Sequence, residues 1–164
     1  MKLYETGLDD VRVHRMWEQM MLSGDMKNFP PCFAGLTIFL NMVQRPTTFL
    51  FEEDDLGIWF AMWLEPSTWD FGIISMWIRE DKRQSGKIAM PAISLALHHF
   101  FTKVSMIVAY TIQPRLIEEY TNFGCELRGV LPRIAFGEDA FMFTMTREQF
   151  AAKLAGVDLR EESE

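Results

Sequence analysis

A six-residue segment in the middle of the chain has the residue types of a phosphate-binding loop, Arg83-Gln84-Ser85-Gly86-Lys87-Ile88. It follows an apolar run that ends at Trp77-Ile78 and precedes a helical pattern that reaches Phe100-Phe101. Main-chain N–H groups at the start of a helix have no intrahelical partners, and the helix dipole adds partial positive charge where they point. A glycine-bearing loop at this place can therefore hold a phosphate, and Arg83 and Lys87 would add charge to it.

A second segment follows the next apolar run and reads Gln113-Pro114-Arg115-Leu116-Ile117-Glu118-Glu119-Tyr120-Thr121-Asn122-Phe123-Gly124-Cys125. Proline near the start and glycine after the end are typical of the two termini of a helix. The phenol of Tyr120, with an ordinary pKa of about 10, can donate a proton to a departing thiolate. The segment therefore predicts a helix that carries one candidate acid.

The first segment resembles the pyrophosphate loop of the GNAT superfamily of N-acetyltransferases, whose pattern is Arg/Gln-x-x-Gly-x-Gly/Ala. Arg83 and Gly86 match this pattern. Ile88 stands where a small residue is usual. A short glycine motif of this kind recurs by chance, so it needs a second match elsewhere in the chain.

The second segment supplies that match, because it resembles the family's Asn-Pro-x-Ala-x-x-x-Tyr-x-x-x-Gly-Phe pattern. Pro114, Tyr120 and Gly124 are in register. Gln113 stands at the Asn position and Cys125 at the Phe position. The two segments have the order and separation of the family, which is more specific than either segment alone.

The resemblance implies an α/β fold with a GNAT-like mixed central sheet, and acetyl-CoA as co-substrate. Strand-edge groups at Met76 to Ile78 would bond the pantetheine arm, and Gln113 would reach the same arm. The loop from Arg83 to Ile88 would take the pyrophosphate, and Tyr120 would protonate the CoA thiolate. The implied reaction is N-acetyl transfer by direct attack of an amine, carried by a small molecule or a peptide.

The sequence offers several candidates for the general base. Many family members place an acid on the fourth strand, but the interior of the strand expected over 69–78 has none. Asp70 at its start and Glu65 at the end of the preceding strand are candidates, and a water chain is the alternative.

The acceptor side would be shaped, as in the family, by the first two helices and the final strand pair. Its aromatic residues would be Phe29, Phe33, Trp63 and Phe136, which suit an apolar or aromatic amine. Ordinary core packing explains the same side chains, so the sequence does not identify the acceptor.

Two departures keep a non-enzymatic alternative open. Ile88 fills space that glycine or alanine leaves free, and Pro91 is tolerated only if its helix begins near Lys87 or later. If both crowd the pyrophosphate, the fold would persist as a structural or interaction module. A weaker likeness, through Ser85-Gly86-Lys87 and Phe123-Gly124, is to small internal virion proteins of tailed phages.

Composition indicates a globular protein with one domain over 1–157 and an acidic tail over 158–164, since 49% of the 164 residues are hydrophobic. No apolar run reaches the roughly 20 residues that cross a bilayer, and the first residues do not form a signal peptide. We therefore expect a cytoplasmic protein without a membrane partner.

The net charge of −7 argues against a nucleic-acid partner. Cys32 and Cys125 lack neighbours at zinc-site spacing, so no metal is expected. A homodimer is left open.

Periodicity predicts the elements that position these residues. Helices are expected after Asp9-Asp10 and after Pro30-Pro31, and over 88–101, 114–124 and 148–155. Strands are expected over 2–6, 47–52, 58–64, 69–78, 104–110, 130–131 and 140–145. The order is strand, two helices, three antiparallel strands, helix, strand, helix and two strands. It is also the order of GNAT proteins.

Overall fold

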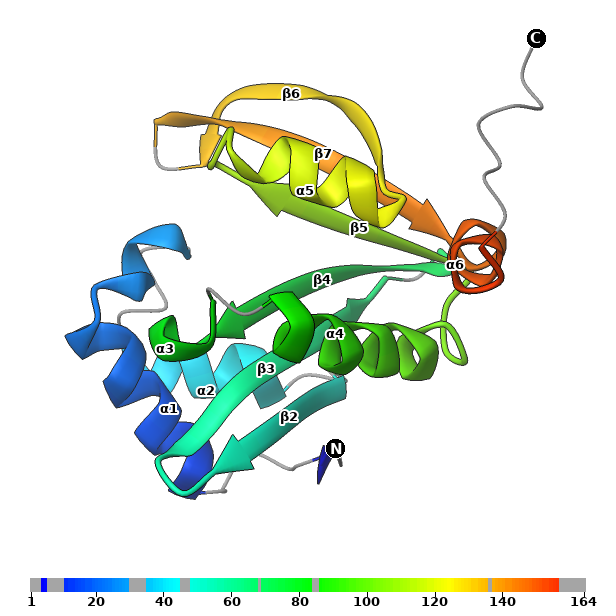
Figure 1. Ribbon diagram of the computed structural model, residues 1–164. Helices are drawn as coiled ribbons and strands as arrows, with labels where there is room; N and C mark the ends of the chain where they lie inside the picture. The colour runs from blue at the N-terminus through cyan, green and yellow to red at the C-terminus, as the bar shows by residue number, and fades with distance from the viewer. Residues whose placement is uncertain are drawn as a thin grey trace, which may run out of the picture. The chain divides into compact units, whose positions relative to one another are not determined.

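The computed structural model describes residues 4–5, 11–29, 35–44, 48–67, 69–83, 86–135 and 137–156 (Figure 1). The chain divides into two compact units, Met1–Pro66 with Ile74–Phe100 and Ser67–Ile73 with Phe101–Glu164. The strand β4 (Phe71–Ile78) begins in the second unit and ends in the first. None of the helices in the described ranges is long and apolar enough to cross a membrane.

The sheet of the first unit consists of β1 (Tyr4–Glu5), β2 (Thr48–Asp54), β3 (Gly57–Pro66) and most of β4, in that order. β1 pairs with β2 and β2 with β3, both antiparallel, and Phe51 lies opposite Ala61. The turn between β2 and β3 is tight because Gly57 adopts a φ of 105°, which favours glycine. The main-chain N–H of Leu56 closes it by donating to Oδ1 of Asp54 at 2.9 Å.

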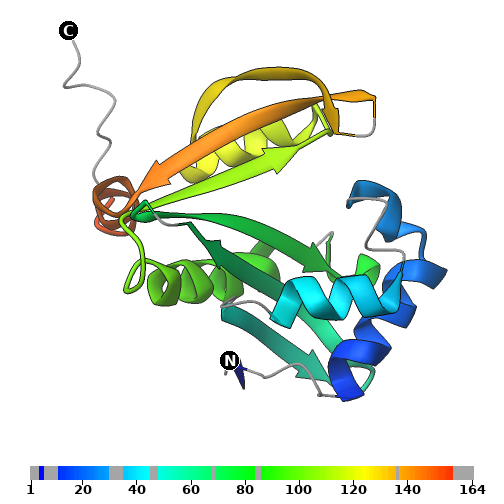
Figure 2. The ribbon, with the colours of Figure 1, turned by 180° about the vertical axis from the view of Figure 1, so that it is seen from behind.

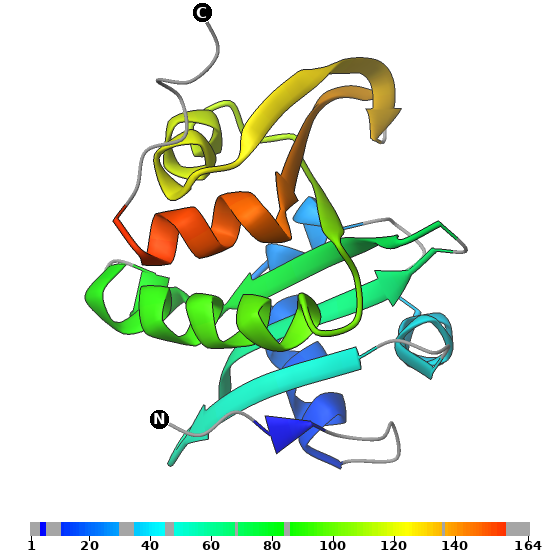
Figure 3. The same cartoon turned by 90° about the vertical axis from the view of Figure 1, so that its right-hand side faces the viewer.

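Helices cover both faces of this sheet. α1 (Val11–Leu22) and α2 (Leu36–Gln44) lie on one face, and α4 (Gly86–Phe100) lies on the other (Figure 2, Figure 3). The buried residues of α1 recur at helical spacing, as its sequence predicts. They pack with the strands into one core, which includes Val13, Met16, Met20, Met26, Phe39, Phe49, Phe51, Ile58, Ala61, Trp63 and Trp77.

The buried face of α4 is apolar and includes Ala92, Ala96, Leu97 and Phe100. The helix runs through Pro91, which is exposed. Proline has no N–H for the carbonyl four residues earlier, so one bond near the start of the helix is missing. α4 begins at Gly86, one residue before Lys87, near which a helix containing this proline is expected to begin.

The last strands of the sheet, in the second unit, pair antiparallel. β5 (Met106–Thr111) pairs with β7 (Glu138–Thr146), and β7 pairs with β6 (Glu126–Ala135). Asp70 and Ser105 directly precede β4 and β5. The main-chain N–H of Ser105 donates to the carbonyl of Asp70, so the two strands begin side by side.

Two helices of the second unit have well-defined ends. α5 (Leu116–Phe123) ends at Gly124, whose φ of 106° is the left-handed conformation expected of a glycine at that place. α6 (Arg147–Leu154) begins with a capping box, in which Thr146 accepts from the N–H of Gln149 and the Gln149 side chain accepts from the N–H of Thr146.

The expected order of the main elements is confirmed, and two short helices add to it. A 3-10 helix, η1 (Asp25–Asn28), follows α1, and a four-residue helix, α3 (Glu80–Arg83), follows β4. Neither carries a hydrophobic period that predicts it. β6 is longer than the strand expected over 130–131.

Candidate functional site

The end of β4 lies at the centre of the candidate site in the first unit. Trp77 is buried there, and Met76 and Ile78 are half-buried. The indole Nε1 of Trp77 donates to Oδ2 of Asp25 at 2.9 Å. The carbonyl of Ile78 accepts from Nε of Arg83 at 2.7 Å. Of the main-chain groups expected to bond a pantetheine arm, the Ile78 carbonyl is therefore already bonded within the chain.

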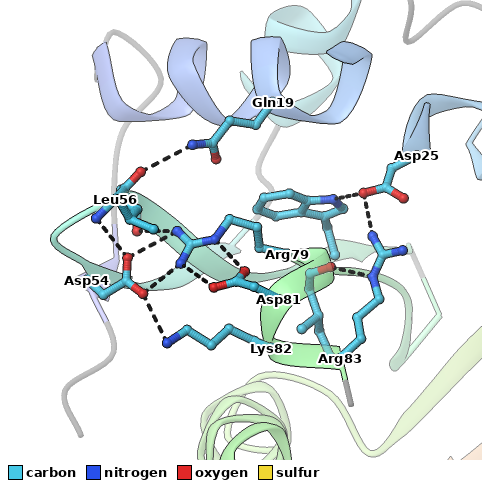
Figure 4. A network of polar contacts seen from close by, with 11 residues as sticks. Gln19, Asp25, Asp54, Leu56, Arg79, Asp81, Lys82 and Arg83 are labelled. Atoms are coloured by element: carbon cyan, nitrogen blue, oxygen red, sulfur yellow. Dashed lines mark hydrogen bonds and ion pairs between the residues drawn. The ribbon is translucent and has the colours of Figure 1, made fainter. Parts of the chain in front are cut away.

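Arg83, expected to add charge to a phosphate, forms an internal ion pair instead. It is the last residue of α3, and its Nη2 donates to Oδ2 of Asp25 (Figure 4). The side chain of Asp25 is 8% exposed and that of Arg83 is 35% exposed. The guanidinium thus joins the end of α3 to η1 and to the end of β4.

The predicted phosphate loop is described in part. Gln84 and Ser85 lie outside the described residues, as do the side chains of Lys87 and Ile88. The backbone of Gly86, Lys87 and Ile88 forms the first turn of α4. The N–H groups of a first helical turn have no intrahelical acceptor, which is what a phosphate site requires. Contact of these groups with a cofactor stays a prediction.

Arg79, the residue after β4, ties the β2–β3 turn to α3. Its guanidinium binds Asp54 with two hydrogen bonds, of 3.0 Å and 2.7 Å, and Asp81 through Nε at 2.7 Å (Figure 4). Nζ of Lys82 lies 3.2 Å from Asp54. The hydrogen bonds from Arg79 are the main reason that the pKa of Asp54 is lowered to about 2. Asp54 therefore stays ionised in all but strong acid.

A groove of about 630 Å³ opens in the first unit between α1, the end of β4 and α3. It is lined by Gln19, Leu22, Ser23, Asp25, Trp77, Arg79, Glu80 and Asp81. Three carboxylates belong to this lining, of which Asp25 is paired with Arg83 and Asp81 with Arg79. Glu80 is exposed and has no ion-pair partner within the described part of the chain. Oε1 of Gln19 is buried and accepts no hydrogen bond there.

Tyr120, the predicted acid, lies on α5 in the second unit. Its ring packs edge-on against Phe143 of β7, with ring centroids 5.0 Å apart. Burial, with smaller effects from Cys125 and Glu119, raises the pKa of Tyr120 to about 12. The phenol therefore keeps its proton at physiological pH. Among the described residues none forms a hydrogen bond with the Tyr120 hydroxyl, so the proton is not shared with a neighbour.

Gln113 lies in the turn before α5. Its Oε1 accepts from Nε of Arg115 at 3.0 Å, and its main-chain N–H donates to Oγ1 of Thr111 at 3.1 Å. The contact with Arg115 occupies the side-chain oxygen and leaves the amide nitrogen as its donor. The pantetheine contact expected of Gln113 stays a prediction.

The remaining candidates divide between structure and surface. Trp63 is 1% exposed and stacks on Phe29 with centroids 5.8 Å apart, so core packing is confirmed for it. Phe33 and Phe136 lie outside the described residues. Of the base candidates, Asp70 is exposed and its Oδ1 accepts from the N–H of Ser105 at 3.2 Å.

Sequence reasoning missed Asp25 and Arg79, which hold the two ion-pair clusters. Asp25 belongs to no motif, and its partner Arg83 is distant in sequence. The run Arg79-Glu80-Asp81-Lys82-Arg83, directly after a buried strand, is the signal that could have indicated such clusters, since it carries charges of both signs.

Neither a protein-family model nor a curated protein sequence matches the chain. Solved structures match it in fold. Spermidine N-acetyltransferase from Vibrio cholerae, in complex with CoA and spermine, matches with a TM-score of 0.71 and 15% identity over 91% of this chain and 98% of that one. RimJ from Mycobacterium smegmatis, in complex with CoA-disulfide, matches with a TM-score of 0.67 and 17% identity over 94% of this chain and 88% of that one.

Proposed function

We propose that this chain, which has the fold of the GNAT acetyltransferases, is an N-acyltransferase that moves an acetyl group from acetyl-CoA to a small-molecule amine. One observation carries the proposal: the fold match covers 91% and 94% of the chain for two structures that contain CoA or its disulfide. Fold alone does not prove activity, so the residues of this chain must also suit the chemistry.

The first turn of α4 suits a pyrophosphate. Gly86 has no side chain to keep the backbone from a phosphate, and the N–H groups of Gly86, Lys87 and Ile88 have no helical acceptor. The main chain of Met76 and Trp77 and the amide of Gln113 would hold the pantetheine arm. When bound, acetyl-CoA supplies a thioester, whose carbonyl carbon is open to an amine.

The transfer forms one C–N bond and breaks one C–S bond. The neutral amine nitrogen attacks and loses one proton to water, or to Asp70 or Glu65. The departing sulfur gains one proton, which we propose comes from the hydroxyl of Tyr120. Solvent then reprotonates the phenolate. The raised pKa of Tyr120 supports this role because it keeps the phenol protonated. The reaction needs no metal.

The groove of the first unit supports a cationic acceptor. In its lining Asp25 and Asp81 are paired with arginines, whereas Glu80 is exposed and has no ion-pair partner among the described residues. Opposite charge draws a cationic substrate to such a surface. The matched Vibrio cholerae enzyme contains spermine, an amine of this kind.

A non-catalytic structural or interaction protein, such as a phage virion component, is the alternative. It is not favoured, because the matched Vibrio cholerae structure is that of an acetyltransferase.

The experiment that tests the function mixes the purified protein and acetyl-CoA with polyamines, aminoglycosides and peptide N-termini. Release of free thiol and an acetylated product in the mass spectrum are the expected results, with cationic amines preferred. Glu80→Gln should raise KM for the amine severalfold, whereas Asp55→Asn, an equal loss of charge on the β2–β3 turn outside the groove, should not. Acetyl-CoA binding without any transfer would favour the non-catalytic alternative.

A further inference from the structure

Asp25 is a buried aspartate between the first helix and the end of β4. It opens η1, and only 6% of the residue is exposed. Burying a carboxylate costs free energy unless donors replace the lost water. Here Nε1 of Trp77 and Nη2 of Arg83 donate to the same oxygen, Oδ2. Burial raises the pKa of Asp25, but the hydrogen bonds from Arg83 and Trp77 outweigh burial, so the pKa lies below its ordinary value and the carboxylate stays charged.

Arg83 stands where α3 ends and the chain approaches α4. α3 ends at Arg83, α4 begins at Gly86, and the two helices are in contact. The bond from Nε to the Ile78 carbonyl and the ion pair with Asp25 hold the Arg83 side chain from two sides (Figure 4). The direction in which a helix starts decides where its free N–H groups point. Because only two residues separate Arg83 from Gly86, the position of Arg83 limits where the first turn of α4 can lie.

We propose that Asp25 is a positioning residue of the cofactor site. Acting through Arg83, it holds the end of α3 in place and so orients the N–H groups of Gly86, Lys87 and Ile88 at the start of α4. The inference rests on the proposed function only in naming CoA as the ligand. Asp25 also belongs to the lining of the groove assigned to the acceptor.

The chain offers a matched control in Asp54. Like Asp25, it is a carboxylate held by charged hydrogen bonds from an arginine, here Arg79, which directly precedes α3. Its partners are Arg79 and Lys82, and it lies at the β2–β3 turn. Loss of its charge should therefore destabilise the first unit without releasing Arg83.

Calorimetric titration with CoA compares the wild type with Asp25→Asn, Arg83→Gln, the double variant and Asp54→Asn, and thermal unfolding reports the stability of each. We expect Asp25→Asn to weaken CoA binding by about tenfold, the effect typical of a lost hydrogen bond to a charged group. Arg83→Gln should weaken it to a similar extent, and the double variant no further, because all three remove one contact. Asp54→Asn should lower the Tm and leave the affinity unchanged.

An unchanged CoA affinity in Asp25→Asn would overturn the proposal. A tighter affinity would overturn it too, since it would mean that the freed Arg83 binds phosphate. Additive losses in the double variant would also overturn it, since they separate the two residues. Should Asp25→Asn not fold, Asp25→Glu replaces it with the same expectations, because the extra methylene moves the carboxylate.

A wild type that does not bind CoA would contradict the proposed function and leave the positioning role to a second measurement. Hydrogen–deuterium exchange of the ligand-free proteins then decides. Faster exchange of amides 90, 92 and 93, the first in α4 that have intrahelical acceptors, in Asp25→Asn but not in Asp54→Asn supports the positioning role. Equal exchange in the wild type and Asp25→Asn overturns it.

Discussion

The guanidinium of Arg83 and the carboxylate of Asp25 form an ion pair across 58 positions of sequence. The pair joins the last residue of α3 to the turn that follows α1. Arg83 is the first residue of the phosphate-loop motif. Because its guanidinium already pairs with Asp25, it is not free to bind a phosphate in this structure. The binding of a pyrophosphate would then depend mainly on the main-chain N–H groups of the first turn of α4.

Gly86→Val should therefore weaken CoA binding strongly, because a branched side chain at the start of α4 keeps the backbone from the pyrophosphate. The fold should survive, since β-branched residues cost less than about 1 kcal/mol in a helix. Gly86→Ala, with its single methyl group, should have a smaller effect. Calorimetry gives the affinities and circular dichroism checks the fold. A folded Gly86→Val protein with wild-type affinity would contradict the assignment of this turn.

Tyr120→Phe should lower kcat by about 10²- to 10⁴-fold, as expected when a general acid is lost. The phenyl ring keeps the packing against Phe143, so stability and acetyl-CoA affinity should not change. Steady-state kinetics with an accepted amine measure both constants. Wild-type turnover in this variant would assign protonation of the sulfur to solvent.

The pKa of Tyr120 can be measured directly. Absorbance of tyrosinate is recorded as pH rises, and the difference between the wild type and Tyr120→Phe isolates this residue. Because burial raises the pKa to about 12, the difference should be absent at pH 10 and emerge only toward pH 12. The same shift contributes stability below pH 10, which is lost as pH rises toward 12. A transition near pH 10 would show that the hydroxyl is hydrated.

Acid stability should depend on Asp54. Its pKa in the folded chain is about 2, below the ordinary value of 3.8. A lowered pKa stabilises the folded state above pH 3.8, and this stability is lost as pH falls toward 2. The contribution is on the order of 1–2 kcal/mol after screening by solvent. Chemical denaturation of the wild type and Asp54→Asn between pH 2 and 7 measures it, and equal pH dependence of the two would contradict the ion-pair assignment.

Much of the fold could be predicted because its main elements have local signatures. The spacing of Val13, Met16 and Met20 predicts the buried stripe of α1, and Gly124 predicts the end of α5. Both signals act within a few residues, where the physical cause of the structure also lies.

The candidate site could be predicted only in part. The first turn of α4 and the position of Tyr120 on α5 follow from motif spacing. The partner of Arg83 does not, because an ion pair between distant segments leaves no local pattern. The burial that raises the pKa of Tyr120 also depends on β7, which follows it in the chain, and no property of α5 alone indicates it.

Binding of acetyl-CoA to the wild-type protein tests the central claim most directly, because it requires no knowledge of the acceptor. Isothermal titration calorimetry should give saturable binding of one acetyl-CoA per chain, with a Kd of about 1 μM to 1 mM, the range usual for enzyme substrates. A folded protein that shows only heats of dilution with millimolar acetyl-CoA would contradict the claim.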